Sequence, residues 1–203
     1  MKLHHLWLAG LLLLAGCATA PTSEHLIGSG RGSWQKTRTT LEKIDGWQIE
    51  GKLGYRAGEQ AGSGNLFWLQ RRDYYDIRLA GPIGIGALQL TGTPDKVRMD
   101  VAGQGSQVAA SPEALLQQQL GWQLPVSHLL WWVRGMPAPG SPVEAEVAPN
   151  GYMAWLIQDG WQVNYLEYEP QGDIRLPSRL RLFGPQVEIT LVIKGWQARH
   201  LGQ

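Results

Sequence analysis

The sequence predicts a mainly β fold, in which a long curved antiparallel sheet of roughly ten or eleven strands is covered on one face by about three α-helices. From Trp47 onward, apolar and polar residues alternate through most of the chain, and Gly-containing turns separate the alternating runs. The helical segments do not alternate regularly with strands, as they would in a parallel α/β fold. Because helices rather than further strands close the curved sheet, we expect an apolar cavity between the two layers.

Three segments predict helices. Residues 33–44 place apolar side chains on one stripe, with Ser33 as the expected N-cap. Ser111, Pro112 and Glu113 form a strong start signal for a second helix, which Gly121 should end. The third helix follows Pro125, where residues 126–133 carry apolar side chains at positions i, i+3, i+4 and i+7.

The remaining periodic segments predict antiparallel strands: 47–56, 65–70, 75–79, 87–91, 96–101, 104–110, 152–158, 160–168, 178–183 and 187–194. Residues 58–64 should form a turn, and Asp159-Gly160 is typical of a tight hairpin. Gly51 falls at an inward position of its strand, which leaves room for a bend or for a ligand across the sheet.

Apolar positions on the strands and helices are the candidates for the cavity lining. On the strands they are Ile49, Leu53, Leu66, Trp68, Ile77, Leu79, Leu88 and Leu90, and on the helices Leu116, Leu120, Leu129 and Trp132. Some of these side chains should line a cavity and others should belong to the closed core, and periodicity does not separate the two groups.

The N-terminus carries an export signal. Lys2 precedes a short apolar run that ends in Leu13-Leu14-Ala15-Gly16-Cys17, and this run is too short to span a bilayer. Leu-Ala-Gly-Cys resembles a bacterial lipobox, in which the Cys thiol receives a lipid. We therefore expect a signal peptide over residues 1–16, a lipidated N-terminus and flexible tether over 17–32, and one folded domain over 33–203. The alternative is an ordinary signal peptide with a chance Cys.

Composition and motifs point away from several function classes. The chain contains 18 Lys and Arg residues and 17 Asp and Glu residues, so its net charge is +1. This charge is not the strongly basic footprint of a nucleic-acid-binding protein. The sequence contains no Gly-x-Ser-x-Gly elbow and no Walker phosphate loop. Beyond residue 16, only His25, His128 and His200 remain, at spacings that do not suit a zinc site. We therefore expect no enzyme activity, no metal and no cofactor.

The loop Ala80-Gly81-Pro82-Ile83-Gly84-Ile85-Gly86 interrupts the strands, because Pro and Gly disfavour a regular ladder. It nevertheless carries two β-branched apolar residues. The Ile83 side chain is either tucked back into the core or exposed at the tip of the loop.

An ordered set of motifs resembles the LolB family of outer-membrane lipoprotein receptors. The set comprises the lipobox, Trp47-Gln-Ile-Glu-Gly-Lys, Phe67-Trp68-Leu-Gln70, Pro82-Ile83-Gly84, Leu120-Gly121-Trp-Gln-Leu124-Pro125-Val126, Leu130-Trp-Trp132-Val-Arg-Gly135-Met-Pro137, Gln158-Asp-Gly160-Trp161-Gln-Val163 and Leu176-Pro177. The resemblance covers essentially all of the chain after Cys17. It implies an unclosed antiparallel β-barrel with a helical lid.

The resemblance also implies a function. A member of this family would accept acylated lipoproteins from the periplasmic carrier LolA and insert them into the outer membrane, without nucleotide hydrolysis. It would act as a monomer, anchored through Cys17 on the periplasmic face and in contact with outer-membrane phospholipid. Pro82, Ile83 and Gly84 match the family's membrane-insertion loop, with Ile83 in place of the usual Leu. Ala18 in place of Asp fits outer-membrane sorting.

Two other interpretations remain open. A structural or assembly lipoprotein would use the same apolar face as closed core and would transfer no lipid. A tethered hydrolase would need a nucleophile, for which the sequence offers no candidate motif.

Overall fold

A computed structural model describes residues 23–81, 86–93 and 95–201. Within these residues the chain forms strands β1 Glu24–Ile27, β2 Gly46–Ala57, β3 Gln60–Arg71, β4 Tyr74–Ala80, β5 Leu88–Thr93, β6 Lys96–Val101, β7 Gly105–Ala109, β8 Val143–Val147, β9 Met153–Gln158, β10 Trp161–Gln171, β11 Ile174–Phe183 and β12 Glu188–Arg199. The helices are α1 Arg31–Glu42, α2 Pro112–Leu120 and α3 Val126–Trp132.

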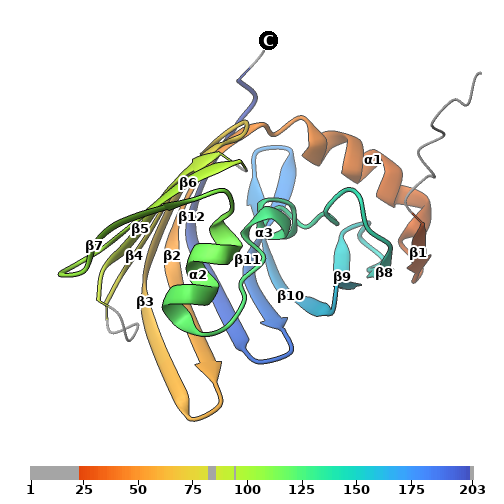
Figure 1. Cartoon of the computed structure of the whole chain (residues 1–203). Helices are drawn as coiled ribbons and strands as arrows, with labels where there is room; N and C mark the ends of the chain where they lie inside the picture. Colours follow the sequence, from red (N-terminus) through yellow and green to blue (C-terminus); the bar gives the residue numbers. More distant parts are fainter. Residues whose placement is uncertain (1–22, 82–85, 94, 202–203) are drawn as a thin grey trace, which may run out of the picture.

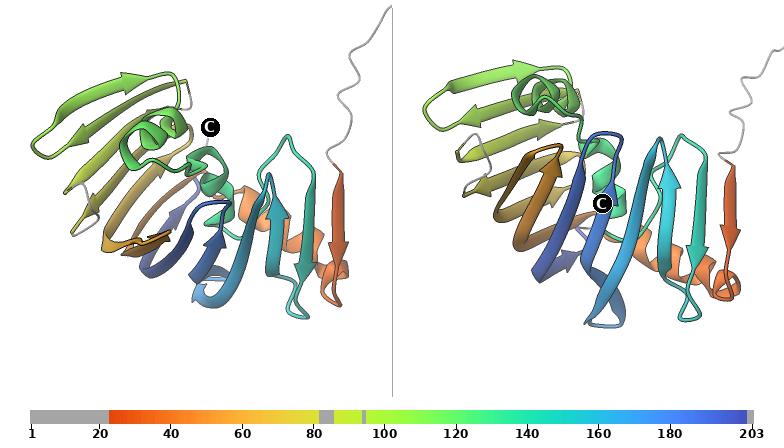
Figure 2. Two further views of the ribbon diagram at one scale, coloured as in Figure 1. Left: turned by 60° about the horizontal axis from the view of Figure 1, so that its bottom comes forward. Right: turned by 90° about the horizontal axis from the view of Figure 1, so that it is seen from below.

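The described strands form one sheet in the order β1-β8-β9-β10-β11-β12-β2-β3-β4-β5-β6-β7. The first and last strands of this order, β1 and β7, do not pair with each other, so the curved sheet is an unclosed barrel (Figure 2). Neighbouring strands run antiparallel except for β1 and β8, which run parallel. This confirms the predicted fold class.

The helices lie against one face of the sheet (Figure 1). Trp34 and Leu41 of α1 are buried, as the predicted stripe requires, and α1 leads from β1 to the start of β2. Leu115 and Leu116 bury one side of α2, and Val126, Leu129 and Trp132 bury one side of α3. The apolar stripes and the inward strand residues therefore form one continuous core.

Local signals set several element boundaries as predicted. The Ser111 side chain accepts a hydrogen bond from Ala114 N at 3.3 Å, with Pro112 at the helix start, and Gly121 ends α2 at φ 78°. Asp159 and Gly160 form the β9–β10 hairpin with φ values of 48° and 77°.

Gly51 marks a close approach of two strands rather than a ligand site. A Cβ at this position would lie 2.0 Å from Val192 O. The pairing of β12 with β2 shifts register between Ile193 and Gly195 at the same level. The Gly therefore permits a β-bulge that bends the sheet.

Two expectations from the sequence were wrong, and one strand in the second half of the chain was missed. The expected turn over 58–64 is short, because β3 already begins at Gln60 and pairs with β2 along its whole length. Helix α1 starts at Arg31 with Gly30 as N-cap, and the Ser33 hydroxyl instead donates to Gly30 O at 2.9 Å. Strand β8 was not predicted.

The expected tether also extends less far than Gly32. Residues 24–27 form β1, which pairs in parallel with β8 from Glu24↔Val143 to Ile27↔Glu146. The described fold therefore includes residues from Glu24 onward, before the expected domain start at Ser33. A strand of four residues gives little periodic signal, and its partner lies more than 100 residues away in sequence.

Candidate functional site

An apolar cavity lies between the helices and the inner face of the sheet. Its lining comes from strands β2–β5, β11 and β12, helices α2 and α3, and the segment that joins these helices. The residues are Leu53, Leu66, Trp68, Ile77, Leu79, Leu88, Leu90, Leu116, Leu124, Val126, Leu129, Leu182, Ile189 and Leu191. All of these side chains are apolar, so the cavity offers no polar group to fix the orientation of a ligand.

The cavity is almost closed in this conformation. Its volume is about 40 Å³, whereas pockets that hold small molecules typically measure about 300–1,000 Å³. A ligand of that size would therefore enter the cavity only after the helices that cover it move.

Nine of the twelve candidate cavity residues do line the cavity: Leu53, Leu66, Trp68, Ile77, Leu79, Leu88, Leu90, Leu116 and Leu129. Ile49, Leu120 and Trp132 are not among its lining residues. Ile49 is fully buried and pairs with Trp68 and Trp196 on the neighbouring strands. Leu120 is the last residue of α2, and Trp132 faces Gln158 of β9.

The candidate set missed five lining residues. Leu182, Ile189 and Leu191 occupy inward positions of β11 and β12, and Leu124 and Val126 flank Pro125. The sequence predicted both segments as strands, but no cavity candidate was placed on them. Their place beside the cavity depends on the pairing of β12 with β2, which local periodicity does not determine.

Helix α3 is held by buried hydrogen bonds. Trp132 Nε1 donates to Gln158 Oε1 at 2.9 Å, and the Tyr165 hydroxyl donates to Trp132 O at 2.9 Å. Just past the helix, Arg134 Nη1 donates to Ile44 O at 2.7 Å. Because breaking these bonds would leave buried polar groups without partners, the C-terminal end of α3 is firmly fixed to the sheet.

Helix α2 is held differently. Glu113 Oε1 accepts from Ser127 N at 2.9 Å, and Gln119 Nε2 donates to Gln104 Oε1 at 2.8 Å, both at exposed positions. The buried residues of α2 are all apolar: Pro112, Leu115 and Leu116. Water can replace the exposed hydrogen bonds, so α2 costs less to displace than α3.

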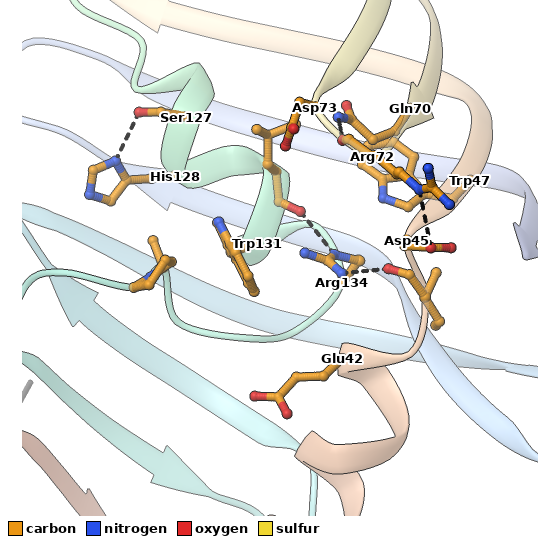
Figure 3. A pocket seen from close by; sticks show the side chains of 14 residues that line it. Glu42, Asp45, Trp47, Gln70, Arg72, Asp73, Ser127, His128, Trp131 and Arg134 are labelled. Carbon is orange, nitrogen blue, oxygen red and sulfur yellow. Dashed lines mark hydrogen bonds and ion pairs between the residues drawn. The ribbon is translucent and has the colours of Figure 1, made fainter. Parts of the chain in front are cut away.

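A second pocket of about 570 Å³ lies near the α1–β2 connection, the β3–β4 turn and α3 (Figure 3). Its apolar wall consists of Ile44, Trp47, Leu130, Trp131, Ala138 and Pro139, and its polar residues are Glu42, Asp45, Gln70, Arg72, Asp73, Ser127, His128 and Arg134. The Trp47 and Trp68 rings, with centroids 4.7 Å apart, contact each other between this pocket and the apolar cavity.

Arg134 is the most deeply buried charged group of this second pocket, with 8% of the residue exposed. Its Nε donates to Leu130 O at 3.0 Å, and its guanidinium lies 4.8 Å from the centroid of the Trp131 ring. Burial lowers the pKa of Arg134 to about 10, although Glu42 and Asp45 counteract this effect. No carboxylate in the described structure lies within ion-pair distance of Arg134.

A polar cluster joins α3 to the β9–β10 turn. His128 Nε2 lies 2.6 Å from Asp159 Oδ2, which also accepts a hydrogen bond from Ser141 Oγ at 2.5 Å. The hydrogen bond from Ser141, followed by the contact with His128, lowers the pKa of the Asp159 carboxyl despite some desolvation. Among the described residues, no group of three or more His, Cys, Asp or Glu side chains could hold a metal ion.

Cys17 and the loop residues Pro82, Ile83 and Gly84 lie outside the described residues, so their predicted roles stay predictions. None of the described helices combines the length and the apolar character that crossing a membrane requires.

The chain is similar to known proteins over nearly its whole length. The family described as "Outer membrane lipoprotein LolB" matches residues 45–196. The "Outer-membrane lipoprotein LolB" of Stutzerimonas stutzeri (strain A1501) is 56% identical over 193 residues, 95% of this chain and 94% of that protein. The protein of the same name from Pseudomonas syringae pv. syringae (strain B728a) is 53% identical over 205 residues and 100% of both chains.

A solved structure shares the fold. The crystal structure of a DUF1329 family protein from Desulfovibrio piger ATCC 29098 covers 87% of this chain and 96% of its own, with a TM-score of 0.54 and 5% sequence identity. At that identity the likeness concerns the fold alone. The family match and the sequence identities carry the assignment, and this chain belongs to the LolB family of outer-membrane lipoproteins.

Proposed function

We propose that this protein is an outer-membrane-anchored receptor that accepts acylated lipoproteins from LolA and inserts them into the outer membrane. The observation that carries the proposal is the cavity lining, which is apolar at every position. Burial of acyl chains in such a lining is non-directional, so it tolerates cargo with different chains and different attached proteins. The family membership supports the same conclusion.

The energetics explain the need for a receptor. Each CH₂ group exposed to water costs about 0.8 kcal/mol. Two or three acyl chains would cost tens of kcal/mol, so free diffusion across an aqueous compartment would be very slow. Without nucleotide hydrolysis, direction would come from increasing affinity for the acyl chains, from the carrier to this protein and then to the bilayer.

Acceptance requires the cavity to enlarge from about 40 Å³. We propose that α2 moves away from strands β5–β7 while α3 stays in place. The buried bonds of Trp132 and Arg134 support a fixed α3, and the exposed polar contacts of Glu113 and Gln119 support a mobile α2. Gly121, in the left-handed conformation at φ 78°, would be the hinge.

Two further elements belong to the proposal. Lipid on Cys17 would anchor the domain to the membrane, since one acyl chain holds weakly and two or more hold stably. Ile83 at the tip of its Pro-Ile-Gly loop would enter the headgroup region during delivery. Burying one Ile contributes roughly 1.5–3 kcal/mol, which is enough to orient the domain but too little to anchor it.

The test uses photo-crosslinking residues incorporated singly in place of Leu66, Leu129 or Leu41. Leu66 and Leu129 line the cavity, whereas Leu41 is a fully buried residue of α1 outside the cavity lining and serves as the matched control. Upon illumination in the presence of LolA loaded with acylated substrate, we expect capture of the substrate at Leu66 and Leu129 but not at Leu41. If neither Leu66 nor Leu129 captures the acylated substrate, the proposal is contradicted.

The small volume of the cavity favours a second candidate, a structural lipoprotein in which these side chains are permanently closed core. Mass spectrometry of the intact protein after mild solubilisation distinguishes the two. Co-purifying lipid and substrate capture support the receptor, whereas their absence together with unchanged membrane anchoring supports the structural role.

A further inference from the structure

We propose that the second pocket, between the α1–β2 connection, the β3–β4 turn and α3, binds the head group of a zwitterionic phospholipid, with the phosphate at Arg134 and the ammonium group at Asp73. This site is separate from the acyl cavity and does not depend on lipoprotein transfer. Its volume of about 570 Å³ is available without any movement of the helices.

The buried guanidinium at the deep end of the pocket favours the binding of an anion. Arg134 has 8% of its surface exposed, and it uses Nε and Nη1 to donate to Leu130 O and Ile44 O. Within the described residues, Nη2 has no acceptor and the guanidinium has no carboxylate partner at ion-pair distance. Buried charges in proteins are normally paired, so this guanidinium can still take a phosphate oxygen through a charge-assisted hydrogen bond.

The other acidic residues of the pocket are already engaged, except one. Glu42 pairs with Arg38 at 2.8 Å, and Asp45 accepts from Leu201 N at 2.6 Å. Asp73 lies exposed in the β3–β4 turn, and its carboxylate makes no hydrogen bond or ion pair with the described residues. The second cation of the lining, Arg72, lies 3.9 Å from Asp45 through its Nε. The pocket therefore combines a buried guanidinium with no carboxylate at ion-pair distance and an exposed carboxylate without a partner among the described residues (Figure 3).

This charge arrangement is complementary to a phosphate-linked ammonium group, with the anion inside and the cation at the rim. A purely anionic head group would satisfy Arg134 but would meet Asp73 unfavourably. The apolar wall adds the second requirement of a lipid, because Trp47, Leu130 and Trp131 can cover a glycerol backbone and the first methylenes of its acyl chains. Membership in a family of outer-membrane lipoproteins places phospholipid within reach of the site.

The experiment is native mass spectrometry of the full lipidated chain, released in mild detergent and mixed with equimolar phosphatidylethanolamine and phosphatidylglycerol of the same acyl composition. We expect the ethanolamine lipid to bind about threefold more tightly, as befits one exposed ion pair. Asp73→Asn should abolish this preference without lowering binding of the glycerol lipid. Asp173→Asn, in the exposed β10–β11 turn, is the matched control and should keep the preference.

Arg134→Gln should weaken the binding of both lipids by about tenfold, because both lipids carry the phosphate group. Arg134→Lys, which retains the charge, should restore most of the binding. If lipid enters only the apolar cavity, binding should show no head-group preference and should not change in the Asp73 and Arg134 variants, which would overturn the proposal. Equal binding of the two lipids by the parent, or an unchanged preference in Asp73→Asn, would overturn the proposal even if Arg134→Gln failed to fold. Binding of free phosphoethanolamine as tight as that of the lipid would overturn the assignment to a lipid.

Discussion

Trp132 and Gln158 are joined by a buried hydrogen bond, in which Trp132 Nε1 donates to Gln158 Oε1 at 2.9 Å. The same Gln158 amide also pairs with both backbone groups of Ala138, accepting from its N–H at 2.9 Å and donating to its carbonyl at 2.8 Å. One side chain of β9 therefore holds both α3 and the segment that follows it. This attachment fixes one half of the helical cover in place.

Gln158→Leu should destabilise the protein by about 3 kcal/mol, because it leaves several buried donors and acceptors without partners. The free energy of unfolding from urea titration measures the effect. Gln162→Leu, on the exposed face of β10, is the matched control and should change stability by less than about 0.5 kcal/mol. Equal effects of the two substitutions would mean that Gln158 does not hold α3.

Backbone amides of α2 should exchange hydrogen faster than those of α3, by about tenfold or more, because the side-chain hydrogen bonds that hold α2 are exposed whereas those that hold α3 are buried. Hydrogen–deuterium exchange with peptide-level mass spectrometry compares residues 114–120 with residues 130–136. Amides of β11, in the middle of the sheet, provide the slow reference. If α3 exchanges as fast as α2, the two helices open together and the proposed hinge at Gly121 is wrong.

Cys17→Ala should release the protein from the membrane, since the lipid on this residue is the expected anchor. Membrane fractionation with a carbonate wash measures the distribution between pellet and supernatant. We expect partial transfer activity to remain, because the anchor mainly raises the local concentration. A variant that still sediments with membranes would show that the anchor lies elsewhere.

Ile83→Glu should leave acceptance from LolA intact and abolish delivery to liposomes, because a charge at the loop tip opposes entry into the headgroup region. A two-step transfer assay with acylated substrate separates the steps. Ile83→Leu should deliver normally, and Val108→Glu is the matched control, since Val108 is a 63% exposed apolar residue on β7. Delivery by Ile83→Glu at the parent rate would exclude the loop as the insertion element. Loss of acceptance together with a lower melting temperature would show that Ile83 belongs to the core.

Acid should weaken the contact between α3 and the β9–β10 turn. In the folded state the hydrogen bond from Ser141, with a smaller effect of His128, lowers the pKa of Asp159 below its ordinary value of 3.8. The resulting stabilisation is therefore present above pH 3.8 and is lost as the pH falls through the lowered folded-state pKa. We expect the stability difference between the parent and Asp159→Asn to shrink below about pH 4, measured by urea unfolding across pH. A stability difference for Asp159→Asn that stays constant as the pH falls would contradict the assignment.

Local patterns in the sequence predicted most of the elements. Alternation predicted ten of the described strands, and the Ser111-Pro112 start and the Gly121 end of α2 agree with the structure. These signals are short-range, because side-chain direction repeats every two residues in a strand and every 3.6 residues in a helix. The same local reasoning failed for β1, whose partner strand is distant in the sequence. Strand β8 pairs with the neighbouring strand β9, and its alternating Val-Glu-Ala-Glu-Val sequence is a local signal that the prediction overlooked.

The sequence by itself determined the mainly β class, the apolar faces of the strands and helices, and the motifs that point to the family. Only the tertiary structure decided which apolar side chains line the cavity. It placed Leu182, Ile189 and Leu191 beside Leu53 and Leu66, and it buried Ile49 and Trp132 elsewhere. It also brought Arg134 and Asp73 to one pocket. The physical reason is that hydrophobic burial is non-directional, so periodicity shows which face is buried but not what that face packs against.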